Sequence, residues 1–263
     1  MSHRKEDRMV QDLISRGQNI ISNNFRQMNH RYLLVLLFLT VCQLASAQFA
    51  KIIDKDGYVN VRQQATVNSV VVSKIAADEI VYAFPDEKFG DWVIVDYTDN
   101  HNKSITGYVH NSRIKYIESY KQIPTVFSDE GTAKFMAKDI IVQINSDRFD
   151  YEKNKGDFSS TQYDGYTVVD KFRGQQVWGT DGEIPTSHYT SIQATIKGRF
   201  IQIPAKEIEN LFNVNNEFAT CYYDDSNDIL YITAVNGDGA GGYAVLFEIK
   251  KGKYHAKVVT MPF

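Results

Sequence analysis

The feature that most constrains this 263-residue chain is a series of short β-rich runs separated by turn-forming residues. Between residues 51 and 118 the runs are five to seven residues long, and Gly, Asn and Asp recur in the breaks between them. These residues favour the tight turns that join antiparallel strands. Strands of this length and spacing predict a small barrel or sandwich. The runs are YVNVR, SVVVSKI, EIVYAF, DWVIVDY, TGYVH and RIKYI.

The same pattern continues from residue 121 to residue 263. Segments such as SIQATIKGRFIQIP and YAVLFEIKKGKY place Gly, Asn or Asp between apolar runs, where a hairpin needs positive φ. One helix is expected, opened by Pro204, continued by AKEIENLF and capped by Asn213. The predicted fold class is mainly β, with a small β-barrel over 51–118 and a second β-rich domain of antiparallel hairpins over 121–263. The short boundary near Tyr120–Pro124 allows the two domains to pack together.

A segment ahead of the β-rich part has the three-part pattern of a signal peptide, over residues 28–47. Arg31 precedes an apolar run from Leu33 to Val41, and Ala45-Ser46-Ala47 supplies the small residues of a cleavage site. The run is too short to span a bilayer, which takes roughly 20 residues. We expect cleavage between Ala47 and Gln48. The mature chain would then reach the periplasm, the cell surface or the medium, with no transmembrane segment.

Residues 1–27 form a polar leader that an export signal does not need. Since Met28 begins a normal signal peptide on its own, we predict that it is the true start and that the leader is an artefact of gene calling. The whole chain has a formal net charge of -3 and no dense run of Lys and Arg, so nucleic acid is not expected as a partner. Cleavage would also leave Cys221 as a single cysteine, which excludes an internal disulfide.

Four motifs in the first β-rich part occur in a characteristic order. They are NVR at Asn60–Arg62, SVVVSKIAADEIVYAF, GDWVIVDY and GYVHNSRI. In this order and spacing they resemble the bacterial SH3-like domain family, over about a quarter of the chain. The resemblance implies a small β-barrel that binds cell-wall peptide or another extracytoplasmic ligand. In the second part, the segments VWGTDGEIPTSHYTSI, IQIPAKEIENLF and NGDGAGGYAVLFEIKKGKY resemble a group of uncharacterised exported proteins of Bacteroidetes-type bacteria, a resemblance that implies no activity.

Alternation along the strands separates an inner from an outer face of the predicted barrel. Val93 and Val95 share one face of DWVIVDY, while Trp92 lies on the other. The same argument directs Tyr82 and Tyr108 outward. Tyr82, Trp92 and Tyr108 are therefore candidate ligand-binding residues that would stack on a peptide or glycan. The alternative is that they pack against the second domain.

Other candidate centres in the mature chain are weak. Cys221 lies in a strand pattern, EFATCYYDD, and we expect a buried small hydrophobic residue there rather than a nucleophile. DDSND and NGDGAGG hold oxygen ligands of the kind that calcium prefers, but hairpin turns use the same residues for backbone reasons. The histidines form no close pair. The loop GTDGEIPTSHY, with Glu183, has neither a phosphate-loop nor a nucleophile-elbow pattern.

These observations favour an exported, non-enzymatic binding protein with no cofactor, no metal and no catalytic residues, whose partner is cell-wall peptide or an envelope protein. Two alternatives stay open. One is a cell-wall hydrolase with an acidic catalytic pair, which would show two close carboxylates in a cleft. The other is an inhibitor or immunity-type protein with a projecting loop, for which GTDGEIPTSHY is the candidate.

Overall fold

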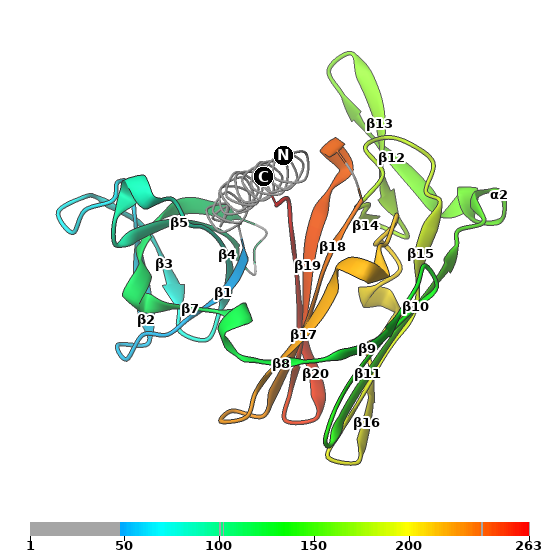
Figure 1. Cartoon of the computed structure of the whole chain (residues 1–263). Coiled ribbons are helices and arrows are strands. Elements are labelled where there is room, and N and C mark those ends of the chain that lie inside the picture. The colour runs from blue at the N-terminus through cyan, green and yellow to red at the C-terminus, as the bar shows by residue number, and fades with distance from the viewer. Residues whose placement is uncertain (1–47, 100, 102, 238, 263) are drawn as a thin grey trace, which may run out of the picture. The chain divides into compact units, whose positions relative to one another are not determined.

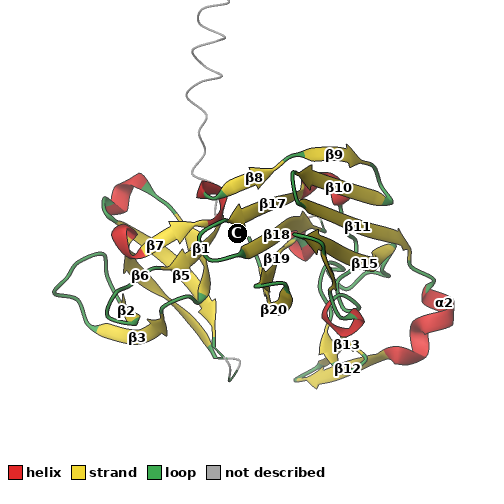
Figure 2. Cartoon of the chain, turned by 90° about the horizontal axis from the view of Figure 1, so that it is seen from below, coloured by secondary structure: helices red, strands yellow, loops and turns green. Residues whose placement is uncertain are grey.

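The computed structural model describes residues 48–262 except residues 100, 102 and 238. The predicted leader, signal peptide and cleavage site involve residues 1–47, which lie outside the described residues. The described residues belong to one compact unit. Within the described residues the fold is mainly β with one short α-helix, as the sequence predicts (Figures 1 and 2).

The first part, here called the N-terminal module, is a single antiparallel sheet of seven strands in the order β3-β2-β6-β5-β4-β1-β7. Figure 1 shows this sheet curling round on itself. Each run predicted from the sequence corresponds to one of its strands. The strands are β1 Gln48–Ile52, β2 Tyr58–Arg62, β3 Val71–Ala76, β4 Ile80–Phe84, β5 Trp92–Thr98, β6 Ser104–His110 and β7 Ile114–Tyr116.

Every second residue along the strands points inward and contributes to the core of this module. Val59 and Val61 on β2, and Val93 and Val95 on β5, are all buried inside the curled sheet. The sheet closes tightly where β2 meets β6, because a Cβ on Gly107 would lie 2.6 Å from Val61 Cγ1. A side chain at this position would therefore force the two strands apart.

The second part, here called the C-terminal module, contains two five-stranded antiparallel sheets and one three-stranded sheet. Their orders are β16-β15-β11-β10-β9, β20-β19-β18-β17-β8 and β12-β13-β14. The strands are β8 Lys121–Ile123, β9 Thr125–Ser128, β10 Thr132–Ala137, β11 Ile140–Arg148, β12 Phe158–Tyr163, β13 Tyr166–Phe172, β14 Gln175–Gln176, β15 Ser187–Ile196, β16 Arg199–Gln202, β17 Ala219–Asp224, β18 Ile229–Asn236, β19 Tyr243–Lys250 and β20 Lys253–Thr260.

The positive φ expected at the hairpins is present. Lys197 and Gly198 have φ values of 50° and 79°, and Lys251 and Gly252 have φ values of 53° and 74°. These pairs join β15 to β16 and β19 to β20. Two successive residues with positive φ match the twist of the flanking strands.

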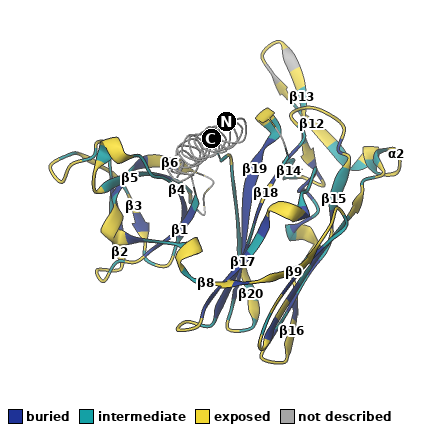
Figure 3. Cartoon of the chain, in the orientation of Figure 1, coloured by how far each residue is buried: buried dark blue, intermediate teal, exposed yellow. Residues whose placement is uncertain are grey.

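The two five-stranded sheets pack face to face over one large hydrophobic core. Val142 and Ile144 of β11 and Val245 and Phe247 of β19 belong to it. The runs ILYITAV and YAVLFEI are almost continuously apolar, a pattern typical of strands that are buried on both faces. Figure 3 shows β17 to β19 as the most deeply buried part of this module.

The second face of β17 to β19 packs against β1 and β4 of the N-terminal module. We call this hydrophobic contact the seam. Each module thus has its own core, and the seam joins them. The buried seam residues are Phe49, Ile80, Tyr82, Ile117, Tyr222, Ile229, Tyr231, Ala244 and Leu246.

The helix predicted after Pro204 is wrong. The segment contains only a 3-10 turn, Ala205–Glu207, because Leu211 and Phe212 are pulled into isolated bridges with Trp178 and His188. Leu211 and Phe212 are both fully buried. The path of the segment is therefore set by packing in the core and not by the one-sided apolar pattern of a helix. Asn213 ends it with φ of 48°.

The α-helix lies elsewhere, at α2 Tyr151–Asn154, where Asp150 accepts a capping hydrogen bond from the Lys153 N–H. Short 3-10 turns complete the fold. They are Glu87–Phe89, Asn111–Arg113, Ile117–Ser119, Lys155–Asp157, Ala205–Glu207, Asn216–Phe218 and Gly239–Gly241. Among the described residues, no helix is both long and apolar enough to cross a membrane.

Candidate ligand-binding site

The outer face of β2, β6 and β5 presents a continuous row of polar and aromatic side chains. Because Val59 and Val61 point inward, Tyr58, Asn60 and Arg62 point outward from β2. Strand pairing then places Arg62 opposite Tyr108 of β6. It also places Trp92 of β5 opposite a second β6 residue, His110. Paired residues of an antiparallel sheet share one face.

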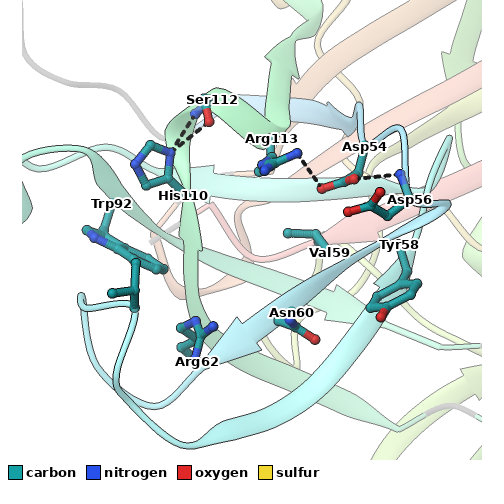
Figure 4. Close-up of a pocket in the computed structure, with 11 residues that line it drawn as sticks. Asp54, Asp56, Tyr58, Val59, Asn60, Arg62, Trp92, His110, Ser112 and Arg113 are labelled. Carbon is teal, nitrogen blue, oxygen red and sulfur yellow. Dashed lines mark hydrogen bonds and ion pairs between the residues drawn. The ribbon is translucent and has the colours of Figure 1, made fainter.

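A cavity of about 380 Å³ opens on this face and is bounded by three connecting segments, those between β1 and β2, between β2 and β3, and after β6. Figure 4 shows Trp92 and His110 at one end and Tyr58 and Asp56 at the other. Arg62 and Asn60 lie along the β2 side. The floor is Val59, which belongs to the module core. The lining residues are Asp54, Asp56, Tyr58, Val59, Asn60, Arg62, Val67, Trp92, His110, Ser112 and Arg113.

One ion pair is built into the wall of the cavity. The Arg113 Nη1 atom lies 3.1 Å from the Asp54 Oδ2 atom, and only 6% of the Asp54 side chain is exposed. The other oxygen, Asp54 Oδ1, accepts a 2.9 Å hydrogen bond from the backbone N–H of Asp56. Asp54 therefore neutralises Arg113 and fixes the turn that carries Asp56.

Arg62 is held differently. Its Nη1 atom donates a 2.7 Å hydrogen bond to the backbone carbonyl of Ser69, a neutral acceptor. The Ser69 side chain in turn accepts from the Gln64 N–H at 2.9 Å, which orders the loop after β2. The guanidinium is therefore oriented while its positive charge has no carboxylate partner among the described residues.

The aromatic end of the cavity is also ordered. The Trp92 and His110 rings meet edge to face, with centroids 5.3 Å apart. His110 Nδ1 accepts from the backbone N–H of Ser112 at 3.3 Å and lies 2.8 Å from the Ser112 hydroxyl. An accepting Nδ1 places the proton of neutral imidazole on Nε2. At the opposite end, the Lys74 ammonium lies 4.0 Å from the Tyr58 ring centroid.

The structure separates the three residues predicted as an aromatic ligand surface. Trp92 lines the cavity. Tyr108 lies next to it on the same face, half-buried, with its ring 5.0 Å from that of Phe89. A ligand-binding role for these two residues stays a prediction.

Tyr82 requires a correction. It points away from the module core, as alternation predicts, but it is only 3% exposed because the seam covers it. Its ring contacts Phe49 and Phe84 edge to face, at centroid distances of 4.9 and 5.3 Å. Burial, together with the Glu118 carboxylate, raises the pKa of Tyr82 to about 12. Tyr82 therefore packs against the C-terminal module and is not part of an exposed surface.

The cavity also contains residues that the sequence reasoning did not select. Tyr58, Asn60 and Arg62 line it from β2. The alternation of YVNVR contains their signal, because its two valines are buried and the side chains between them point outward. Asp56, Arg113 and Ser112 come from loops, and no local pattern places them beside β2.

Cys221 is confirmed as a buried core residue. Its side chain is fully covered within the large core of the C-terminal module, and burial raises the pKa of its thiol well above the usual value. A thiol nucleophile requires the opposite, since the thiolate is the reactive form.

The acidic loop DDSND uses its side chains to form a turn. Asp224 Oδ1 accepts from the backbone N–H groups of Ser226 and Asn227, and its Oδ2 accepts from the Asn227 side chain at 2.7 Å. Asp228 pairs with Lys197 at 2.9 Å. In the part of the chain that the structure describes, no group of three or more His, Cys, Asp or Glu side chains could hold a metal ion.

The loop GTDGEIPTSHY is tied to its own module. Asn213 Oδ1 accepts from the backbone and hydroxyl of Thr186, and Asn213 Nδ2 donates to the Gly179 carbonyl at 2.7 Å. His188, at its end, packs against Phe149 with ring centroids 5.3 Å apart. Burial lowers the pKa of His188. The loop is thus braced against the fold.

Comparison with known proteins gives no relative to place beside this geometry. No family model, no curated protein and no solved structure matches the chain.

Proposed function

We propose that this chain is an exported binding protein without enzymatic activity, whose N-terminal module is SH3-like and recognises cell-wall peptide or another envelope ligand. The observation that carries the proposal is the cavity on the outer face of β2, β5 and β6. It combines an aromatic wall, a peptide-like amide on Asn60 and charged groups of both signs. Ligand sites of this kind hold one end of a molecule by stacking and orient the rest by polar contacts.

Two further observations support a role in binding. Asp54, Arg113, His110 and Ser112 are fixed by their own hydrogen bonds before any ligand arrives, so little ordering is needed on binding. The motif Asn60–Arg62, which the sequence resemblance includes, contributes two of the cavity's side chains.

The first test is sedimentation of the purified protein with peptidoglycan sacculi. Wild-type protein is expected in the pellet. Trp92→Ala is expected to lose binding by about tenfold or more, since stacking on an aromatic ring contributes on the order of 1.4 kcal/mol, which corresponds to a factor of ten. Phe200→Ala is the matched control, because Phe200 is an exposed aromatic residue on the C-terminal module.

Release of soluble wall fragments in the same samples would contradict the absence of enzymatic activity. Failure of folded wild-type protein to sediment would contradict wall binding. Export is tested separately by the mass of the natively produced protein, which should begin at Gln48.

A further inference from the structure

Within the described part of the chain, two charges of opposite sign in the cavity have no ionic partner. Arg62 there donates only to the Ser69 carbonyl, and the Asp56 carboxylate forms no ion pair. The charges of Asp54 and Arg113, on the same wall, neutralise each other. The charges of Arg62 and Asp56 are therefore available to charged groups of a ligand.

Arg62 is suited to a carboxylate. A guanidinium carries five N–H donors in a fixed fork, and the known contact to Ser69 uses only one nitrogen. That contact also fixes the plane of the group, so less side-chain entropy is lost when a carboxylate binds in the bidentate geometry.

Asp56 is suited to an ammonium. The turn that presents its carboxylate is fixed by the backbone hydrogen bond to Asp54 at 2.9 Å, and Asp56 is exposed. The Tyr58 ring beside it already carries a cation, Lys74. The group at this end that can pair with a ligand ammonium is therefore the Asp56 carboxylate.

The separation of these ends sets the length of the ligand. The outward-facing residues Tyr58, Asn60 and Arg62 extend over four steps of β2, which is about 13 Å at roughly 3.3 Å per residue. An extended peptide of about four residues spans the same distance. Asn60, between the two ends, can both donate to and accept from a peptide group.

Resting on the proposed function of the same site, we propose that the cavity binds the C-terminal end of a short extended peptide of about four residues. The terminal carboxylate lies on Arg62, the side chain of the last residue packs against Trp92, and an ammonium at the other end lies near Asp56. The ligand class is thus a zwitterionic tetrapeptide with a free C-terminus.

The test titrates the whole purified protein with Ala-Ala-Ala-Leu and follows binding by calorimetry. The same peptide with a C-terminal amide, and the same peptide with an acetylated N-terminus, are the matched ligands. The free peptide is expected to bind about 10- to 100-fold more tightly than the amide, because a hydrogen-bonded charged pair contributes on the order of 1.5 to 3 kcal/mol. Acetylation is expected to weaken binding by a smaller factor, since Asp56 is exposed.

Variants then assign each end. Arg62→Gln should abolish the preference for the free acid over the amide, and Asp56→Asn should abolish the preference for the free amine over the acetylated peptide. Arg148→Gln is the control, because Arg148 is an exposed arginine on the C-terminal module. Equal affinity of wild-type protein for acid and amide, or no binding of the free peptide, would overturn the proposal without requiring any variant to fold.

The two proposals fail in different ways. Binding to sacculi without discrimination between acid and amide would leave the proposed function intact and remove this ligand assignment. Binding of the free peptide without binding to sacculi would keep the ligand assignment and remove cell-wall binding.

Discussion

Replacing Tyr82 by alanine should destabilise the protein and leave the ligand site intact. The side chain is 3% exposed in the seam and contacts Phe49 and Phe84 edge to face. Truncating a buried aromatic residue to alanine costs about 3 to 5 kcal/mol, through the lost transfer free energy and the cavity left behind. For a chain of this size each kcal/mol lowers the melting temperature by about 2 to 4 °C. We therefore expect Tyr82→Ala to melt about 10 °C below the wild type.

The assays are thermal unfolding and urea-induced unfolding, both followed by circular dichroism, with peptide binding measured in the absence of urea. Tyr108→Ala is the matched control. That residue is half-buried and contacts Phe89, so its loss should cost only about 1 kcal/mol. A Tyr82→Ala protein that keeps wild-type stability and loses ligand binding would refute the placement of Tyr82 in the seam.

Two further predictions concern the C-terminal module. Gly179→Ala should lower the free energy of unfolding by more than about 2 kcal/mol, because φ is +98° and the new Cβ would lie 2.3 Å from the Phe212 carbonyl oxygen. Gly182→Ala, with φ of +80° and open space around it, should cost about 1 kcal/mol in the same urea titration. Glu248→Gln should raise the free energy of unfolding at pH 7, since burial raises the pKa of this carboxyl and its charged form is disfavoured. The folded-state pKa lies above the unfolded value of about 4.3, so the gain should disappear as the pH falls below that value; an equal gain at pH 3 would contradict this explanation.

Much of the fold was accessible from local sequence patterns. Alternation in DWVIVDY identified the buried Val93 and Val95, and paired turn residues such as Lys197-Gly198 identified the hairpins. These features depend on the period of the strand and on the backbone conformations that individual residues allow. Both are properties of a few neighbouring residues.

The helix after Pro204 could not be predicted in the same way. The spacing of its apolar residues suits a helix, yet both Leu211 and Phe212 form β-bridges with residues that are distant in the sequence. Leu211 also packs in the large core, and Phe212 packs against Phe149. Their burial energy outweighs the local preference, since helix propensity amounts to only a few tenths of a kcal/mol per residue.

The candidate site likewise depends partly on local sequence patterns and partly on contacts between distant segments. The sequence by itself determined that Trp92 and Tyr108 point outward from their strands, and it contained the same information for Arg62. Only the tertiary structure decided that Tyr82 is covered by the seam and that Arg62 and Asp56 share one cavity. Alternation tells which face of a strand a side chain lies on, but what covers that face depends on contacts between segments far apart in the chain, and these arise only when the whole chain folds.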